Sequence, residues 1–238
     1  MNQQFIQSLS IDWNKIEDDS YLREIEAINK LKEVVFEKPI TFFVGENGSG
    51  KSTLLEALAV SYGFNPEGGT KNYSFSTFDS HSELYNAIRI SKGFRKAKWG
   101  YFLRAESFYN VATKELEYSD WAHPSEKYHE KSHGESFLAL TQNHLRPNGL
   151  YLFDEPEAGI DLWSFTGLID VFRDLRSHLD GSLVIISHQE RILAIADEIV
   201  VIADGVVQQA GPRALVLPGL LDGAAGCTQC PNKEVGKQ

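Results

Sequence analysis

Cysteine is scarce in this chain. Only two cysteines, Cys227 and Cys230, occur among the 238 residues. So few cysteines cannot cross-link a domain of this length, which excludes a disulfide scaffold and requires a substantial apolar core instead. The pair has C-x-x-C spacing, but a zinc site usually needs four ligands and no second pair supplies them. We interpret the pair as part of a flexible tail or as a metal-binding element of unassigned role.

Long apolar runs and positive charge are also in short supply. No run approaches the roughly 18 residues that span a bilayer, and the first residues lack the basic start and apolar stretch of a secretory signal. We therefore expect a cytoplasmic protein without a transmembrane segment. The 33 acidic residues outnumber the 23 basic ones, which gives a net charge of -10. This balance excludes a general attraction to nucleic acid or anionic membranes, although a local patch can still bind either.

A glycine-rich segment is the strongest motif in the chain. The segment G-E-N-G-S-G-K-S begins at Gly45 and matches the pattern G-x-x-x-x-G-K-[ST] completely. The β-branched and aromatic residues 40–44 predict a buried strand before it, and the leucines after it recur at helical spacing. Glycines let backbone N–H groups approach phosphate oxygens, and the start of the helix adds a positive dipole. The loop is therefore expected to hold a nucleoside triphosphate through Gly45, Glu46, Asn47, Gly48, Ser49, Gly50, Lys51, Ser52 and Thr53.

The chemistry of phosphoryl transfer assigns further roles around this loop. The Lys51 ammonium is expected to reach the β- and γ-phosphates, and the Ser52 hydroxyl to bind Mg²⁺. Residues 150–153 predict a second strand, which delivers Asp154 and Glu155 to its carboxyl end, where ligands of open α/β sheets bind. Asp154 is expected to share the Mg²⁺ with Ser52, and Glu155 to polarise the attacking water. A pair of merely solvated carboxylates is the weaker alternative, because a phosphate loop precedes them.

The order and spacing of these motifs, together with a later strand that ends at Ser187 and His188, resemble those of ABC-type ATPases. The resemblance implies that the nucleotide is ATP, that Glu155 is the catalytic base and that His188 contacts the γ-phosphate. Glu155, His188 and Lys51 are thus the catalytic candidates. The resemblance also implies Mg²⁺-dependent hydrolysis by a head-to-tail homodimer, in which each chain caps the nucleotide of the other.

The motif that caps the partner's nucleotide is expected at Ser132, Gly134 and Glu135. Ser132 and Glu135 form an S-x-x-E capping box, which predicts the start of a helix. A helix start with a serine and a glycine can bind an anion. The alternative is a helix start with no further role, but the position between the two ATP motifs favours the functional interpretation. The segment A-G-I-D resembles the loop that faces the dimer partner and assigns Asp161 to the same interface.

Different parts of the chain resemble different branches of this family. Residues 30–157 are similar to RecF/SMC-like proteins and to small predicted ATPases related to them, without a long coiled-coil insertion. Residues 158–230 are similar to transporter-like ATPases, above all the ATPase subunit of sulfur-mobilisation (Suf) iron–sulfur assembly. The chain is either a natural intermediate or a join of two related lineages. Three functions stay open: a DNA-associated ATPase, an assembly or transport ATPase with a protein-complex partner, and a non-catalytic nucleotide-dependent scaffold.

Together these patterns predict an α/β P-loop fold of the ABC-ATPase type. We expect a mostly parallel sheet with flanking helices, an N-terminal antiparallel portion and a small helical insert over roughly residues 65–135. Residues 1–215 are expected to form a single ATPase domain, and residues 216–238 a C-terminal tail. The glutamine that senses Mg²⁺ in transporter ATPases has no clear match, and Glu106 is the nearest polar candidate.

A basic cluster stands out in this acidic chain. Residues 89–98 contain five basic side chains, and Phe94 and Trp99 lie within or beside them. One interpretation is contact with a nucleic-acid backbone, with bases stacked on the aromatic rings. The other is a solvated surface, and the sequence favours this second interpretation because charge runs are usually solvated.

Overall fold

The computed structural model describes residues 4–25, 28–72, 82–119, 128–178 and 180–221. The main sheet has six strands in the order β5-β6-β7-β3-β8-β9. Neighbours from β5 to β8 are parallel, and β9 runs antiparallel to β8. The strands of this sheet are β3 (Ile40–Val44), β5 (Trp99–Arg104), β6 (Gly149–Asp154), β7 (Ser182–Ile186), β8 (Glu198–Ala203) and β9 (Val206–Pro212). The predicted α/β fold with a mostly parallel sheet is confirmed.

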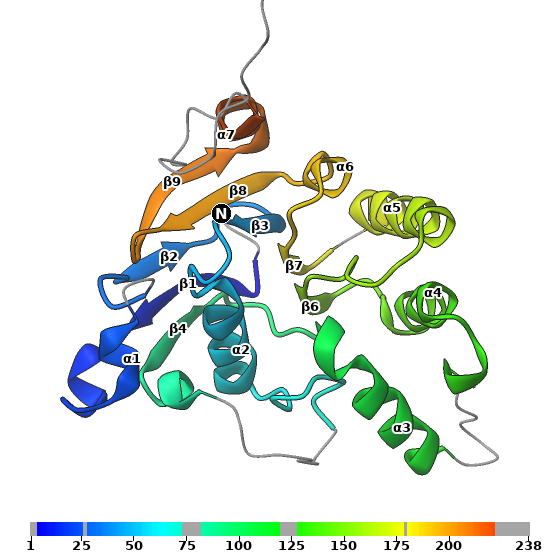
Figure 1. Ribbon diagram of the computed structural model, residues 1–238, viewed down its shortest axis with the longest axis horizontal. Coiled ribbons are helices and arrows are strands. Elements are labelled where there is room, and N and C mark those ends of the chain that lie inside the picture. Colours follow the sequence, from blue (N-terminus) through cyan, green and yellow to red (C-terminus); the bar gives the residue numbers. More distant parts are fainter. Residues whose placement is uncertain (1–3, 26–27, 73–81, 120–127, 179, 222–238) are drawn as a thin grey trace, which may run out of the picture.

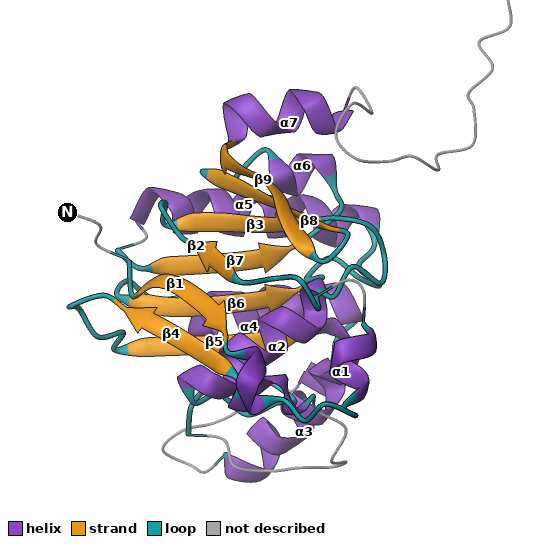
Figure 2. Cartoon of the chain, turned by 90° about the vertical axis from the view of Figure 1, so that its left-hand side faces the viewer, coloured by secondary structure: helices purple, strands orange, loops and turns teal. Residues whose placement is uncertain are grey.

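A second sheet is antiparallel and has three strands in the order β2-β1-β4. Its strands are β1 (Ile6–Ile11), β2 (Glu33–Val35) and β4 (Ile88–Lys92). The antiparallel portion expected near the N-terminus is therefore present, and its third strand comes from beyond the phosphate loop. Figure 2 shows this small sheet beside the main one.

Helices cover both faces of the main sheet. In Figure 1, α2 lies beside the antiparallel sheet, whereas α4 and α5 lie beyond β6 and β7. The α-helices are α1 (Tyr21–Glu24), α2 (Lys51–Tyr62), α3 (Phe108–Tyr118), α4 (His133–His144), α5 (Leu162–His178), α6 (Glu190–Leu193) and α7 (Arg213–Leu221). Four short 3-10 helices complete the described part: η1 (Trp13–Lys15), η2 (Glu83–Asn86), η3 (Ala105–Ser107) and η4 (Tyr128–Glu130).

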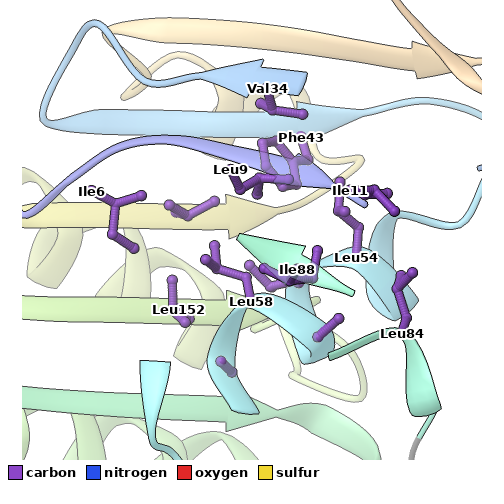
Figure 3. Packing of buried hydrophobic residues seen from close by; sticks show 14 of the residues in the cluster. Ile6, Leu9, Ile11, Val34, Phe43, Leu54, Leu58, Leu84, Ile88 and Leu152 are labelled. Carbon is purple, nitrogen blue, oxygen red and sulfur yellow. The ribbon is translucent and has the colours of Figure 1, made fainter. Parts of the chain in front are cut away.

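The two faces of the sheet bury two separate apolar clusters. Leu150 and Leu152 of β6 belong to the cluster shared with α2 and the antiparallel sheet, whereas Tyr151 and Phe153 belong to the cluster shared with α4 and α5. Figure 3 shows the first cluster, in which side chains of α2 lie among those of both sheets. Because both faces are covered, the central strands read as continuous apolar runs, which is why their sequence predicts buried strands.

The segment expected as a helical insert, residues 65–135, contains strands as well as helix. β4 and β5 occupy its middle, and α3 is its longest helical part. At the other end of the chain, α7 crosses the boundary drawn at residue 215. The expected tail beyond residue 221, which includes Cys227 and Cys230, lies outside the described residues. Within the described part of the chain, no helix combines the length and the apolar character needed to cross a membrane.

Truncation of a buried aromatic on α5 tests the second apolar cluster. Phe172 is fully buried and its ring lies 5.9 Å from that of Phe153, measured between centroids. We expect Phe172→Ala to lower the free energy of unfolding by about 3–5 kcal/mol, because it removes apolar contacts and leaves a cavity. Urea unfolding followed by circular dichroism measures this change. Trp163→Ala is the matched control, since Trp163 lies on the same helix with 87% of its surface exposed, and its loss should change stability by less than about 0.5 kcal/mol.

Candidate nucleotide-binding site

The phosphate loop joins the end of β3 to the start of α2. Gly48 and Gly50 have φ values of 81° and 78°, and Gly50 is the N-cap of α2. These left-handed conformations favour glycine, because a side chain at such positions strains the backbone. The ammonium of Lys51 donates hydrogen bonds to the carbonyl oxygens of Gly45 and Glu46, at 2.9 and 2.7 Å, and to Ser49 Oγ at 3.2 Å. The Lys51 ammonium is thus held by oxygens of its own loop, and the two left-handed glycines lie where the motif places them.

Ser52 and Asp154 connect the loop to the acidic end of β6. The Ser52 hydroxyl donates a hydrogen bond of 2.9 Å to Asp154 Oδ1. Burial raises the pKa of Asp154 from 3.8 to about 6, against the opposing effects of the Ser52 hydrogen bond and Arg104. Hard divalent cations prefer oxygen ligands of this kind. Since a hydroxyl and a carboxylate oxygen lie side by side here, the residues present fit a Mg²⁺ ion.

Glu155 and His188 lie next to this pair. Glu155 has a φ of 49°, which is unusual for a residue other than glycine, and its N–H donates to the carbonyl oxygen of Ile186 at 3.1 Å. Its Oε1 lies 3.7 Å from Nε2 of His188, and the two side chains are 45% and 38% exposed. Burial and the nearby Lys51 lower the pKa of His188, and Glu155 partly opposes them. The imidazole is therefore held toward its neutral form, beside a carboxylate that water can reach.

A cavity of about 410 Å³ opens beside these groups. Its lining includes Ser52, Asp154, Glu155 and Glu106, with Ala158 and Gly159 at its border. A larger hollow of about 560 Å³ lies between α4 and α5, where Leu145 and Leu175 are among its lining residues. Volume alone would favour the larger hollow. We place the site at the smaller cavity, because the hydroxyl of Ser52 and the carboxylates that suit a metal converge there, at the start of α2.

The remaining predicted site residues lie at the starts of α4 and α5. The predicted capping box is confirmed: Ser132 Oγ accepts a hydrogen bond of 3.3 Å from the Glu135 N–H, and Glu135 Oε2 accepts one of 3.0 Å from the Ser132 N–H. Asp161 caps α5, where it accepts hydrogen bonds from the N–H groups at positions 163 and 164. A Cβ at Gly134 would overlap Ser164 and approach Asp161. These residues therefore form one group, and none of them lines the cavity beside Ser52.

Comparison with known proteins assigns the chain to a family. Residues 21–145 match the family model of the AAA domain. The chain belongs to the AAA domain family. The match covers more than half of the chain, and the phosphate loop with Lys51 and Ser52 falls inside it. The recognition of an ABC-type P-loop ATPase from the motifs is confirmed.

Two curated proteins resemble this AAA domain. One is a Drosophila melanogaster protein named as a multidrug resistance-associated protein, 25% identical over 245 residues, which cover 98% of this chain and 17% of that protein. The other is a Pyrococcus abyssi protein named as an ABC transporter ATP-binding protein, 38% identical over 69 residues, or 29% of this chain and 26% of that protein. The chain thus spans about a quarter or less of the length of the curated relatives that it matches.

Two solved structures of MJ1267, an ATP-binding cassette of an ABC transporter, are also similar. Both are 18% identical to this AAA domain. One has a TM-score of 0.48 and covers 92% of this chain and 96% of its own, and the ADP-bound one has a TM-score of 0.43 and covers 81% and 88%.

Arg104 is a site residue of the AAA domain that the motifs do not reveal. It ends β5, forms ion pairs with Glu56 of α2 and with Glu106, and its Nε lies 3.9 Å from Asp154 Oδ2. Glu106, considered as a replacement for a metal-sensing glutamine, thus pairs with Arg104 while it also lines the cavity. The sequence signals were a basic residue at the end of an apolar strand and a glutamate within the apolar face of α2.

Glu157 is the second residue that the motifs do not assign. Its Oε1 accepts hydrogen bonds from Ser187 Oγ at 2.6 Å and from the His188 N–H at 3.3 Å. Its Oε2 is buried and has no hydrogen-bond partner among the described residues. Burial raises the pKa of Glu157, although these hydrogen bonds oppose the shift. Glu157 therefore links the segment after β6 to the backbone that carries His188, and its sequence signal was a third carboxylate in D-E-P-E.

The raised pKa of Asp154 predicts a pH-dependent effect on stability. The folded state binds this proton more tightly than the unfolded state, so ionised Asp154 destabilises the fold above about pH 6, and this cost fades as the pH falls toward 4. Asp154→Asn cannot ionise, so we expect it to raise the free energy of unfolding by up to about 3 kcal/mol at a pH near 8 and by little at a pH near 4. Urea unfolding without nucleotide or metal, repeated across this range, measures the difference. Asp19→Asn, at an exposed carboxylate, controls for the lost charge. The prediction is contradicted if the gain in the free energy of unfolding caused by Asp154→Asn does not increase as the pH rises.

Proposed function

We propose that this chain binds ATP together with Mg²⁺ and hydrolyses the ATP to ADP and phosphate. The observation that carries the proposal is the hydrogen bond of 2.9 Å between Ser52 and Asp154, with Glu155 and His188 beside it. This arrangement brings a phosphate loop, a pair of metal-binding oxygens and a water-accessible carboxylate to one edge of the sheet. Phosphoryl transfer needs these parts and relies mainly on positioning and electrostatic stabilisation.

Each residue has a distinct task in this proposal. The loop N–H groups and the Lys51 ammonium bind the phosphates, and the three oxygens that now accept from Lys51 are exchanged for phosphate oxygens. Ser52 and Asp154 hold the Mg²⁺, which neutralises phosphate charge when bound. Glu155 orients the attacking water and accepts its proton. His188, held toward its neutral form, offers an imidazole nitrogen to the γ-phosphate.

We further propose that two copies of the chain close head to tail around ATP. The support is the group at the starts of α4 and α5, where Ser132, Glu135 and Asp161 are exposed and do not line the cavity of their own chain. Ser132 and Gly134, at the start of α4, and Glu135 would contact the nucleotide of the second copy, and Asp161 would face that copy. ATP makes contacts in the closed dimer that ADP lacks, so hydrolysis would reopen it.

Among the ATPase branches, we favour the RecF/SMC-like one over the Suf-type or transport subunit. One support is the S-H-G-E form of the α4 start, which departs from the L-S-G-G-Q form of transporter ATPases and resembles the RecF/SMC-like branch. The other is the family match over residues 21–145, where the RecF/SMC-like resemblance lies. The third function, a non-catalytic nucleotide-dependent scaffold, would be indicated if the protein binds nucleotide but shows no turnover.

Glu155→Gln separates nucleotide binding from catalysis. We expect the variant to bind ATP with nearly unchanged affinity, because no hydrogen bond joins Glu155 to the phosphate loop in the described part of the chain, and to lose at least about 100-fold in turnover with the general base. Size-exclusion chromatography with light scattering should show a dimer in Mg-ATP, since the nucleotide is no longer consumed. Glu33→Gln, an exposed carboxylate on β2, is the matched control. A monomer at saturating Mg-ATP contradicts the two-chain arrangement, and preserved turnover contradicts the role of Glu155.

Glu157 is expected to act by positioning His188. Glu157→Ala removes the acceptor for Ser187 Oγ and the His188 N–H, so phosphate release should fall about 10-fold as the histidine loses its placement. Glu157→Gln keeps an acceptor oxygen and should retain most of the activity. Phosphate release and ATP affinity are measured for both variants. Equal losses in the two variants, or a loss of ATP affinity matching the loss of turnover, would assign Glu157 a role in folding or binding instead.

A further inference from the structure

A basic and aromatic surface lies at the end of the main sheet opposite the nucleotide site. We call it the basic-aromatic surface, and it consists of Lys71, Lys92, Phe94, Lys96, Lys98, Trp99 and Arg146. Trp99 begins β5 opposite Gly149, whereas Arg104 ends the same strand opposite Asp154. The length of β5, about 16 Å, therefore separates this surface from the nucleotide site, so neither the motifs nor the proposed hydrolysis uses it.

The connection between β4 and β5 presents its side chains from an anchored backbone. The Gly93 N–H donates to the carbonyl oxygen of Phe5 at 3.0 Å, and the Lys98 N–H to that of Asn148 at 3.0 Å. Arg95 turns inward and pairs with Asp180 at 2.5 and 2.8 Å. The side chains between these anchors alternate, so that Phe94, Lys96 and Lys98 are exposed, and Phe94 has 76% of its surface in solvent.

Cations lie against aromatic rings across this surface. The Arg146 guanidinium lies 4.6 Å above the ring of Trp99, which is 49% exposed. The ammonium groups of Lys71 and Lys92 lie 3.8 and 4.7 Å from the ring of Tyr62 at the end of α2. Burial, reinforced by Lys92, lowers the pKa of Lys71 to about 8. Two like charges thus share one ring, an arrangement that a bound anion would stabilise.

Among the residues that the structure describes, the cations of this surface form no ion pair with a carboxylate. Arg89 and Arg95 are paired with Asp12 and Asp180, both at 2.5 Å. Arg89 and Arg95 are therefore not counted in the surface. Across the described ranges, no ion pair joins a carboxylate to its five cations, which are Lys71, Lys92, Lys96, Lys98 and Arg146. The sequence alone favoured a solvated surface here. In a chain with a net charge of -10, five cations without a carboxylate partner favour a binding surface for an anionic ligand instead.

We propose that the basic-aromatic surface binds single-stranded nucleic acid. The bases stack on Phe94 and Trp99, and the lysines with Arg146 contact the phosphates. The exposed rings decide the class of ligand, because base faces are open to stacking in single strands and closed in a duplex. A duplex would engage the cations and leave the rings without a role. An anionic membrane would receive both cations and exposed rings, so the vesicle comparison in the test separates it from a single strand. Single-stranded DNA and RNA share this chemistry.

Fluorescence anisotropy with labelled oligothymidylate and oligouridylate tests the proposal, with a labelled duplex and anionic vesicles for comparison. Five phosphate contacts predict that affinity for the single strands falls about 100-fold between about 50 and 200 mM salt. Lys96→Glu with Lys98→Glu should weaken single-strand binding about 100-fold, because four units of charge change at the contact. The matched control, Lys30→Glu with Lys32→Glu, makes the same charge change at exposed lysines before β2 and should have less than about 3-fold effect.

Phe94→Ala tests the stacking independently of charge. We expect about 10-fold weaker single-strand binding and unchanged duplex binding, whereas Trp163→Ala, at another exposed aromatic, should change neither. Phosphate release should persist in all of these variants, so a failure of the proposed hydrolysis is distinguishable from a failure here. Absence of single-strand binding at about 50 mM salt, equal losses in the lysine control, or insensitivity to Phe94→Ala overturns the proposal. Preferred binding of duplex or of vesicles, lost with the lysines alone, overturns it in favour of a surface that recognises charge only.

Discussion

The parallel register of β3, β7 and β6 is the constraint on which the nucleotide site depends. Ile186 at the end of β7 pairs with Phe43 of β3 on one side and with Asp154 of β6 on the other. All three strands therefore end at the same level, and the segments that leave them carry the phosphate loop, Glu155 and His188. Because side chains alternate between faces, a slip of one residue would move every buried side chain of a strand to the wrong cluster. The two apolar clusters thus fix the register, and the register brings the phosphate loop, Glu155 and His188 to one edge of the sheet.

The same site concentrates charge that the fold must tolerate. Asp154 and Glu157 have raised pKa values because burial disfavours their charged forms. Arg104 provides partial compensation through Glu56 and its approach to Asp154. Functional sites commonly accept such unfavourable electrostatics at the expense of stability. The burial that destabilises the carboxylates also excludes water from around them, which strengthens their interaction with a bound cation.

Two elements connect the ends of the molecule. α2 begins at Lys51 in the phosphate loop and ends at Tyr62 under two lysines, and β5 begins at Trp99 and ends at Arg104. The nucleotide site and the basic-aromatic surface therefore share a helix and a strand while they occupy opposite edges of the sheet. The starts of α4 and α5 form a separate group of polar residues, which does not line the cavity of its own chain.

Local sequence was enough to predict the parts of the nucleotide site that depend on consecutive residues. The loop from Gly45 to Thr53 could be predicted because its glycine spacing specifies a backbone shape, and the capping box at Ser132 because its bonds span three residues. The central strands could be predicted because both faces are buried. Arg104, Glu56 and Glu157 escaped prediction, since their roles come from contacts between segments far apart in the chain. The same holds for Lys71 and Arg146, which join the cluster at residues 89–98 only when α2 and the end of α4 pack against β5. These residues come together because the two apolar clusters are buried when the whole chain folds. Contacts of this kind have no pattern in the local sequence from which they could be predicted.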